Sequence, residues 1–220
     1  MSGLFVTGTD TGVGKTFVTA ALLSELRRRG VRAGAFKPIA CGAAGRRDAR
    51  IYARLVNHEA PLDVINPIWL RHPLAPSVAA KLERRRIDLR TVQARYKRLA
   101  TAYSMVFVEG AGGLLVPIKR DYLVADLAKE LRLPLLIVAR LGLGTINHSL
   151  LTVHQARAMG LKIAGIVLND TTGRRGLAEK TNIVEIPKLC GVPLLGVVPH
   201  GGGGAAAICR KLFGDAGVFE

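Results

Sequence analysis

Short apolar runs alternate with longer amphipathic segments along most of the chain. The apolar runs are not interrupted by polar residues, so both faces of each predicted strand should be buried. Strands that alternate with helices predict a mostly parallel sheet flanked by helices, a three-layer α/β fold. The predicted strands are Leu4–Thr7, Ala33–Lys37, Met105–Glu109, Leu135–Ala139, Ile163–Leu168 and Leu194–Val197. The predicted helices are Lys15–Arg29, Asp48–Asn57, Pro76–Arg85, Leu89–Tyr103, Tyr122–Leu131, Ile146–Met159 and Ala178–Cys190.

The pattern continues without an internal repeat or a linker, and 220 residues suit one large domain. We therefore expect a single domain over residues 1–220. One tract interrupts the pattern late in the chain, where Gly201–Gly204 is a run of four glycines. Glycine weakens helices and strands, so this tract predicts a flexible loop before a short C-terminal tail that holds one short helix at most.

The first predicted strand runs into a glycine-rich loop. Residues Gly8–Thr16 read Gly-Thr-Asp-Thr-Gly-Val-Gly-Lys-Thr. The order of strand, loop, Lys-Thr and helix is typical of a phosphate-binding loop, or P-loop, in which backbone N–H groups and the helix N-terminus face a polyphosphate. Lys15 would reach the β- and γ-phosphates, and the Thr16 hydroxyl would ligate Mg²⁺. The sequence therefore predicts a P-loop NTPase-type fold, with a loop one residue longer than the usual spacing.

Two charged residues stand at the ends of predicted strands, where parallel sheets bind their ligands. Lys37 is either a second ammonium aimed at the phosphates, if the first two strands are neighbours, or an ordinary strand-end lysine in water. Glu109 follows a buried run and precedes Gly110–Gly113. An acid in this place favours a Mg²⁺ anchor over a turn cap. The glycines after it would let backbone approach a nucleotide.

Three more polar residues have an ordinary structural interpretation. Asp48 begins a predicted helix, and its position alone favours a plain helix N-cap. Asn169 and Asp170 follow a predicted strand, which favours a turn pair that closes the strand. Asn169 could instead present a donor and an acceptor to a purine edge.

The formal net charge is +16, from 32 Lys and Arg against 16 Asp and Glu. A basic excess is typical of nucleic-acid partners. Here the excess is scattered over predicted helix faces and loops without interleaved aromatic residues, so no base-stacking platform is present. We therefore expect no nucleic-acid partner, and the sequence gives no reason for the excess.

The cysteines and the apolar segments indicate the compartment. Cys41, Cys190 and Cys209 have neither metal-ligand spacing nor an even number, which favours a reducing cytosol. No apolar stretch approaches the ~20 residues of a membrane span, and no signal peptide is evident. We expect a cytoplasmic protein without a membrane partner.

Taken together, these motifs resemble the dethiobiotin synthetase family, the ATP-dependent enzymes of biotin synthesis. The resemblance runs from Gly8 to about Pro199, and the lengthened P-loop is itself a mark of the family. The motifs that carry it are Thr7–Thr16, Lys37-Pro38, Asn66-Pro67, Glu109–Gly113, Leu143–His148, Asn169-Asp170 and the strand that ends at Pro199.

The resemblance implies an enzyme that carboxylates 7,8-diaminononanoate and closes its ring to dethiobiotin. One amine of the substrate takes up CO₂ or bicarbonate carbon as a carbamate. The carbamate oxygen attacks the γ-phosphate of Mg-ATP and forms a carbamic–phosphoric anhydride. The second amine then closes the ureido ring and expels phosphate. The protein supplies positioning and charge stabilisation.

The resemblance also implies a role for each matching residue. The catalytic residues are Lys15, Lys37 and Thr11. The Mg²⁺ residues are Thr16, Asp48 and Glu109. The ATP-binding residues are Gly12, Val13, Gly14, Lys15, Thr16, Phe17, Asp48, Glu109, Gly110, Ala111, Gly112, Asn169, Asp170, Pro199, His200 and Gly201, with Asn169 reading the adenine. The residues that bind the diamine or its carbamate are Thr11, Lys37, Cys41, Gly144, Thr145, Ile146 and Asn147.

Family members are homodimers, so the resemblance implies a homodimer here. In the family the segment equivalent to Gly144–Asn147 helps to hold the substrate carboxylate of the neighbouring subunit. A helix N-terminus suits a carboxylate. The substrate site is therefore expected at the subunit interface.

The chain departs from the family at three places. Gly12 replaces a frequent Glu, and Cys41 replaces a frequent Ser or Thr, whose hydroxyl is a stronger donor than a thiol. The family commonly has an acidic residue shortly after the equivalent of Pro199, where this chain has His200 and four glycines. Selectivity for ATP over other nucleotides is therefore left open.

Two other classes share the fold. Partitioning ATPases act as switches on DNA or membranes, but they carry a second lysine early in the P-loop, where this chain has Asp10. Cobyrinate-type amide synthetases need a further glutaminase domain, for which 220 residues leave no space. The switch ATPase remains the alternative to the ligase.

Overall fold

The computed structural model describes residues 3–42 and 46–214. Its main sheet has six strands in the order β10-β9-β8-β1-β5-β2, and every neighbouring pair is parallel. All six correspond to predicted strands. They are β1 (Gly3–Gly8), β2 (Ala33–Phe36), β5 (Met105–Gly113), β8 (Leu135–Arg140), β9 (Ile163–Asn169) and β10 (Leu194–Val198).

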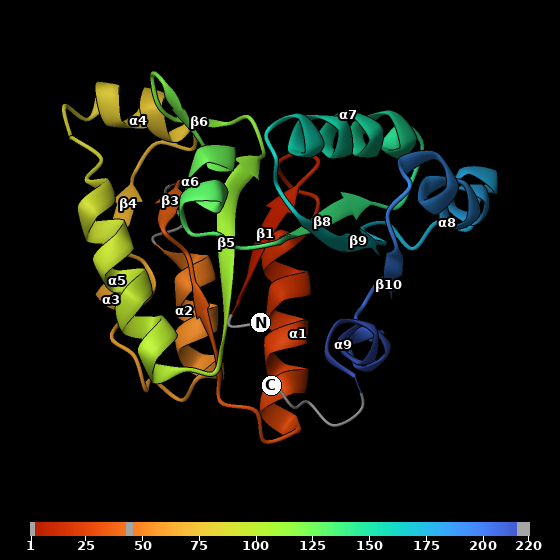
Figure 1. Ribbon diagram of the computed structural model, residues 1–220, viewed down its shortest axis with the longest axis horizontal. Helices are drawn as coiled ribbons and strands as arrows, with labels where there is room; N and C mark the ends of the chain where they lie inside the picture. Colours follow the sequence, from red (N-terminus) through yellow and green to blue (C-terminus); the bar gives the residue numbers. More distant parts are fainter. Residues whose placement is uncertain (1–2, 43–45, 215–220) are drawn as a thin grey trace.

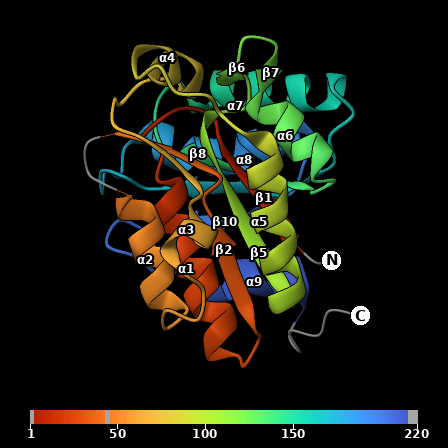
Figure 2. The ribbon, with the colours of Figure 1, turned by 90° about the vertical axis from the view of Figure 1, so that its left-hand side faces the viewer.

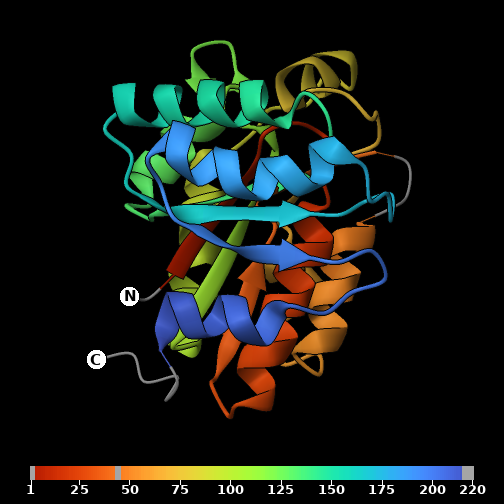
Figure 3. The ribbon, with the colours of Figure 1, turned by 90° about the vertical axis from the view of Figure 1, so that its right-hand side faces the viewer.

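Helices cover both faces of this sheet, so the predicted three-layer α/β fold is confirmed. One layer holds α1 (Lys15–Arg28), α2 (Arg47–Leu55) and α9 (Ala205–Phe213). The other layer holds α5 (Leu89–Ala102), α6 (Val124–Glu130), α7 (Thr145–Ala158) and α8 (Leu177–Cys190). The labelled elements can be followed in Figure 1; Figure 2 shows α1 and α2 across the sheet from α5, and Figure 3 shows α7 and α8 across β9 and β10 from α9.

The core follows from this layering. The run Leu135–Ala139 in β8 is wholly inaccessible to solvent, as are Leu4, Phe5 and Val6 in β1. A strand buried on both faces needs apolar side chains at every position rather than at alternate ones. Each such side chain contributes ~1.5–3 kcal/mol when it leaves water. Within the described residues, no helix is long and apolar enough to cross a membrane.

The structure adds short elements that the sequence pattern did not predict. They span two to four residues each, too few for a hydrophobic period to show. β3 and β4 form a small parallel pair, β6 and β7 form a hairpin, and α4 matches a predicted helix beside them. The bounds are β3 (Ile39–Cys41), α3 (Leu62–Ile65), β4 (Ile68–Leu70), α4 (Pro76–Leu82), β6 (Pro117–Lys119) and β7 (Tyr122–Leu123).

Two of the differences between predicted and observed boundaries have a clear structural cause. The helix expected from Tyr122 begins at Val124, because Tyr122 and Leu123 pair with β6 and Asp126 accepts the backbone N–H of Leu123 at 2.7 Å. The strand expected to end at Glu109 continues through the glycines to Gly113, which pairs with Gly8 of β1. A Cβ on Gly110 would lie 2.9 Å from Val124 Cγ1, so close packing, not a turn, calls for glycine there.

The four-glycine tract connects β10 to α9, which is the short tail helix allowed by the sequence. All four glycines have positive φ, from 76° at Gly204 to 108° at Gly202. L-residues adopt this region at a cost of ~1–2 kcal/mol each. Gly204 is also the N-cap of α9, and a Cβ there would lie 2.5 Å from the carbonyl oxygen of Val197.

The tract offers a matched pair of substitutions. Gly201→Ala should cost ~1–2 kcal/mol of unfolding free energy, because φ is 87° and a Cβ there would meet nothing within 4 Å. Gly204→Ala should cost a further ~1–3 kcal/mol, because the new Cβ also collides with backbone. Urea unfolding of both variants measures the difference, and equal losses would contradict it.

Glu25 on α1 should make stability depend on pH. Hydrogen bonds from Arg28 and then Arg29 lower the pKa of Glu25 to about 2. Because the folded pKa lies below the unfolded one, this stabilisation is present above the unfolded pKa of ~4.3 and is lost as pH falls towards 2. Glu25→Gln should therefore lower the unfolding free energy at pH 7 by no more than ~1 kcal/mol. The loss should shrink between pH 5 and pH 3 in urea titrations.

Glu185→Gln on α8 is the control, since Glu185 has one exposed partner, Lys188, at 3.2 Å. A Glu25→Gln deficit that stays constant from pH 7 to pH 3 would show that the carboxylate charge is not its source.

Candidate active site

The P-loop joins β1 to α1 with two left-handed glycines. Gly12 has φ 75° and Gly14 has φ 92°. Between them Val13 is buried and anchors the loop in the core. The Lys15 ammonium folds back and donates to the Asp10 carbonyl at 3.1 Å. A Cβ on Gly8 would lie 2.8 Å from this ammonium, so Gly8 leaves the space that Lys15 occupies.

Lys15 is a buried cation with incomplete compensation. Burial, the largest cause, and the nearby Lys37 charge together lower the pKa of its ammonium to about 8, against the attraction of Glu109. Desolvation disfavours the charged form of a buried lysine. An anion placed at the P-loop would restore that charge balance, which is what a polyphosphate provides.

Lys37, Glu109, Asp48 and Thr16 meet at the carboxyl end of β5. The Lys37 ammonium lies 2.6 Å from Oε1 of Glu109 and 2.9 Å from Oδ2 of Asp48. The Thr16 hydroxyl donates to the same Oε1 at 2.9 Å. Two segments that are far apart in sequence, those of Thr16 and Lys37, therefore converge on the Glu109 carboxylate, and Asp48 joins them through Lys37.

The strand order explains this convergence. The condition attached to Lys37, that the first two strands are neighbours, is not met: β5 lies between β1 and β2. Lys37 follows β2 and Glu109 lies in β5, whose register pairs Val6 with Glu109. Glu109 thus stands between the P-loop and Lys37 and brings them to one place.

The electrostatics favour an ion pair over an ordinary surface lysine. Burial lowers the pKa of Lys37, but the charges of Glu109 and Asp48 outweigh burial and raise it above the usual lysine value. Lys37 is 6% exposed and Glu109 1%. The pair is therefore a desolvated cation and anion, and the interpretation of Lys37 as a lysine in water is wrong.

Asp48 is not the helix N-cap. Arg46 holds that position without a side-chain hydrogen bond, and Asp48 lies in the first turn of α2. Its carboxylate instead pairs with Lys37. The position that favoured a cap thus serves the cluster.

Tyr52 is a member of the cluster that the sequence did not reveal. Its hydroxyl donates a hydrogen bond to Oε2 of Glu109, and its side chain is fully buried. Burial and the Glu109 charge raise its pKa well above the usual tyrosine value, so the phenol remains a donor. An aromatic residue on the buried face of a helix is predicted to be a core residue. The one signal was its place four residues after Asp48, on the same helix face.

The oxygen ligands at this place fit Mg²⁺. The ligands are two carboxylates, those of Glu109 and Asp48, which both pair with the Lys37 ammonium. The Thr16 hydroxyl lies beside them and donates to Glu109. Within the described residues no group of three His, Cys, Asp or Glu side chains could hold a metal by itself. Mg²⁺ typically binds one or two carboxylates and completes its shell with phosphates and waters, so the residues present suit a Mg-nucleotide and not a bare metal centre.

Asn169 and Asp170 follow β9 and differ in role. The Asn169 amide donates to the Val13 carbonyl at 2.9 Å, and its Oδ1 is buried without a hydrogen-bond partner. The Asp170 carboxylate accepts the backbone N–H of Gly173 at 2.7 Å and pairs with Arg175 at 2.7 Å. Asp170 thus forms the predicted turn, whereas Asn169 contacts the P-loop and keeps one free acceptor.

The remaining predicted nucleotide contacts lie after β10 and on α1. Phe17 is 47% exposed, and a Cβ on Gly202 would lie 3.7 Å from its ring. Gly202 closes a turn on the Pro199 carbonyl at 2.9 Å. His200 is exposed and lies beside Gly173. The turn at Pro199, His200 and Gly201 therefore lies between the P-loop helix and the Asp170 turn. Ala111 and Gly112 continue β5 past Glu109.

Thr11 and Cys41 flank the cluster. Thr11 is exposed, and its Oγ1 would lie 3.4 Å from a Cβ on Gly112. Cys41 ends β3 and is half-buried. Burial raises the pKa of the Cys41 thiol to about 11, in spite of Lys37. Cys41 is therefore a neutral, weak donor.

Gly144–Asn147 opens α7 at the same edge of the sheet. β8 leads to it and pairs with β1, with Val138 opposite Gly8. Gly144 is the N-cap with φ 89°, and Thr145 is buried with its hydroxyl unpaired. Among the described residues, the hydrogen bonds of this segment stay within the loop and helix, as where the backbone N–H of His148 donates to the Gly144 carbonyl at 3.3 Å. The structure thus places the segment beside the P-loop strand without joining it to the Lys37 cluster.

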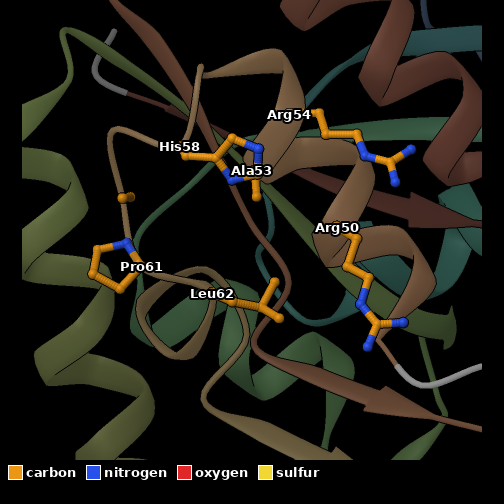
Figure 4. A pocket seen from close by; sticks show the side chains of 7 residues that line it. Arg50, Ala53, Arg54, His58, Pro61 and Leu62 are labelled. Atoms are coloured by element: carbon orange, nitrogen blue, oxygen red, sulfur yellow. The ribbon is translucent and has the colours of Figure 1, made fainter.

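A pocket of about 350 Å³ lies on the opposite face of α2. Figure 4 shows Arg50 and Arg54 extending from the helix, with His58, Pro61 and Leu62 on the other side. Arg50 and Arg54 lie about half a helical turn from Asp48 and Tyr52. None of its lining residues is a predicted site residue. By contrast, a tight recess beside Glu109 is lined by Pro38, Ile39, Ile118, Val124 and Leu127.

Solved structures share the fold at low sequence identity. A ParA family ATPase from Chlorobium tepidum TLS has a TM-score of 0.56 and 13% identity, covering 98% of this chain and 91% of that chain. The MinC:MinD cell division protein complex of Aquifex aeolicus gives a TM-score of 0.57 and 15% identity, covering 95% and 85%. These likenesses confirm the P-loop NTPase-type fold and nothing finer.

Sequence relatives are much closer. A family model described as AAA domain matches residues 2–202. The ATP-dependent dethiobiotin synthetase BioD of Bacillus licheniformis is 46% identical, covering 90% of this chain and 86% of the relative. The protein of the same name from Akkermansia muciniphila is 39% identical, covering 91% and 93%. Because relatives are this similar over nine-tenths of this chain, the chain belongs to the dethiobiotin synthetase family.

Proposed function

We propose that this protein is an ATP- and Mg²⁺-dependent cyclo-ligase that converts 7,8-diaminononanoate and CO₂ into dethiobiotin, ADP and phosphate. The observation that carries the proposal is the buried Lys37–Glu109 pair, 2.6 Å apart, on which the P-loop residue Thr16 also converges. Relatives named ATP-dependent dethiobiotin synthetase support the substrate. In this proposal residues 1–220 act as one ligase domain.

The chemistry requires stabilisation of charge that spreads over a transferred phosphoryl group. Lys15 and Lys37 would face the γ-phosphoryl and carbamate oxygens from two sides, as buried ammonium groups that need no reorganisation. Thr16, Glu109 and Asp48 would hold Mg²⁺ directly or through water. When bound, the metal neutralises phosphate charge. Thr11 would contact the carbamate, and the neutral Cys41 thiol would add a weak hydrogen bond.

The nucleotide would lie across the carboxyl ends of the strands. Backbone N–H groups from Gly12 to Thr16 would surround the phosphates. The free Oδ1 of Asn169 suits the amino group of a purine, since its own amide is occupied by Val13. Phe17 and the turn from Pro199 to Gly201 would border the base and ribose. Gly110–Gly112 and Asp170 would contribute backbone and loop shape.

The substrate carboxylate would bind at the start of α7 in a homodimer. Gly144–Asn147 presents a helix N-terminus. Leu143 and Leu151, on either side of it, are 89% and 62% exposed. Large exposed leucines beside a polar segment suit a subunit interface. In this proposal Gly144, Thr145, Ile146 and Asn147 serve the neighbouring subunit's site.

The proposed compartment is the cytoplasm, because free thiols suit a reducing environment and all three cysteines are free. The alternative function is a switch ATPase acting on DNA or a membrane. The fold supports it, through structures at 13% and 15% identity, and the net charge of +16 would fit it. Fold alone does not determine function.

The dependence of ADP release on the diamine separates the two functions. Purified protein with Mg-ATP and bicarbonate should release ADP only when 7,8-diaminononanoate is added, because the carbamate of the diamine is the phosphoryl acceptor. A coupled assay for ADP measures this, with 1,8-diaminooctane as a control that lacks both the adjacent amines and the carboxylate. ADP release that is independent of the diamine, or that is stimulated by DNA or vesicles instead, would overturn the ligase proposal.

Lys37 should be needed for most of the turnover. Lys37→Ala should lower kcat by ~10³-fold or more, since cations at a transferred phosphoryl group are worth that much. Nucleotide affinity should change much less, because the P-loop backbone is intact. Steady-state kinetics and ADP titration calorimetry separate the effects. Lys162→Ala, at an exposed lysine distant in sequence, is the control. A near-normal kcat in Lys37→Ala would remove Lys37 from the mechanism.

A further inference from the structure

Glu109 is hydrogen-bonded on both oxygens, and different parts of the chain hold each one. Oε1 accepts from Thr16 at 2.9 Å and from Lys37 at 2.6 Å. Oε2 accepts from the Tyr52 hydroxyl. Oε1 therefore faces the P-loop, and Oε2 is turned towards α2.

Tyr52 is built into α2 in a way that fixes this arrangement. Its ring is fully buried, and Ala49 and Ala53 on the same helix are buried beside it. Asp48, four residues earlier, lies on the same face and holds Lys37. One helix thus positions both the carboxylate that holds Lys37 and the hydroxyl that holds Glu109.

The orientation of Glu109 has a chemical consequence. A carboxylate with two free oxygens can rotate or bind a cation through both, whereas a hydrogen bond on one oxygen leaves the other to face the cation. Partners that orient metal ligands typically change metal affinity or activity by ~10- to 100-fold when they are removed. The apolar recess beside Glu109 offers no replacement donor from Pro38, Ile39 or Ile118.

We propose that Tyr52 is a positioning residue of the Mg-nucleotide site: its hydroxyl holds Oε2 of Glu109 so that Oε1 faces Thr16 and the bound Mg²⁺. The inference rests on the proposed function through the assignment of Glu109 to the metal. Tyr52 touches neither substrate nor nucleotide in this proposal and acts only through Glu109.

The test is Tyr52→Phe, which removes the hydroxyl and keeps the ring that packs in the core. ADP binding is measured by calorimetry over a Mg²⁺ series and in EDTA, without turnover. The Mg²⁺ concentration that half-maximally tightens ADP binding should rise ~10- to 100-fold, and ADP affinity in EDTA should be unchanged within about twofold. Tyr96→Phe is the matched control, since Tyr96 is a tyrosine on another helix, α5. It should change neither the Mg²⁺ dependence nor the ADP affinity in EDTA.

Several results would overturn the inference. One is an unchanged Mg²⁺ dependence, and another is an equal loss of ADP affinity in EDTA. A variant that fails to fold would also overturn it, since the hydroxyl would then be structural. In a Glu109→Gln background, Tyr52→Phe should change the Mg²⁺ dependence by less than ~2-fold, because the proposed effect passes through the Glu109 carboxylate. If the unmodified protein itself shows no Mg²⁺-dependent nucleotide binding, the proposed function fails first; if it does and Tyr52→Phe matches it, only the role of Tyr52 fails.

Discussion

The burial of one carboxylate, that of Glu109, is the constraint on which the candidate site depends. An ionised carboxylate in the interior costs several kcal/mol unless it is paired and hydrogen-bonded. Glu109 meets that need with donors from α1, from the residue after β2 and from α2. The side chains of Thr16, Lys37 and Tyr52 are therefore fixed relative to one another by the same charge. Removing Lys37 would leave a buried carboxylate without its counter-ion, and removing either hydroxyl would take away one of its hydrogen bonds.

The sequence predicted the six main strands and the P-loop because each has a strong local signal. A doubly buried strand is a continuous apolar run, and the P-loop is a contiguous motif. Strand order has no such signal, since β1 and β2 are buried throughout and β5 is buried from Met105 to Gly110, with nothing local that tells neighbours apart. We expected Lys37 to lie beside the P-loop if β1 and β2 were neighbouring strands, and they are not neighbours. Lys37 is linked to the P-loop all the same, because the intervening strand β5 supplies Glu109, which contacts both Lys37 and Thr16.

Long-range side-chain contacts are the second thing that local patterns miss. Asn169 and Asp170 looked alike as a turn pair, but only Asp170 bonds to its own turn. Asn169 reaches the P-loop carbonyl of Val13, and a Cβ on Gly14 would lie 2.0 Å from its amide nitrogen. Gly14 therefore meets two demands, a left-handed φ of 92° and space for Asn169. The motif explains the first demand, and only the fold explains the second. Tyr52 was missed for the same reason, because its ring satisfies the core pattern and hides the role of its hydroxyl.

The charge distribution separates attraction from selection. The four ionised side chains Lys15, Lys37, Glu109 and Asp48 sum to zero, so the net charge of +16 lies outside this cluster. A basic surface raises the local concentration of any polyanion and is screened by salt. The buried cluster is screened much less. Only a ligand that brings both phosphate charge for Lys15 and a cation for the two carboxylates would complement all of its charges. A Mg-nucleotide satisfies both conditions at once, whereas a bare polyanion such as DNA satisfies only the first. A Mg-nucleotide would therefore be favoured at the buried cluster, whereas the basic surface would attract anions of any kind.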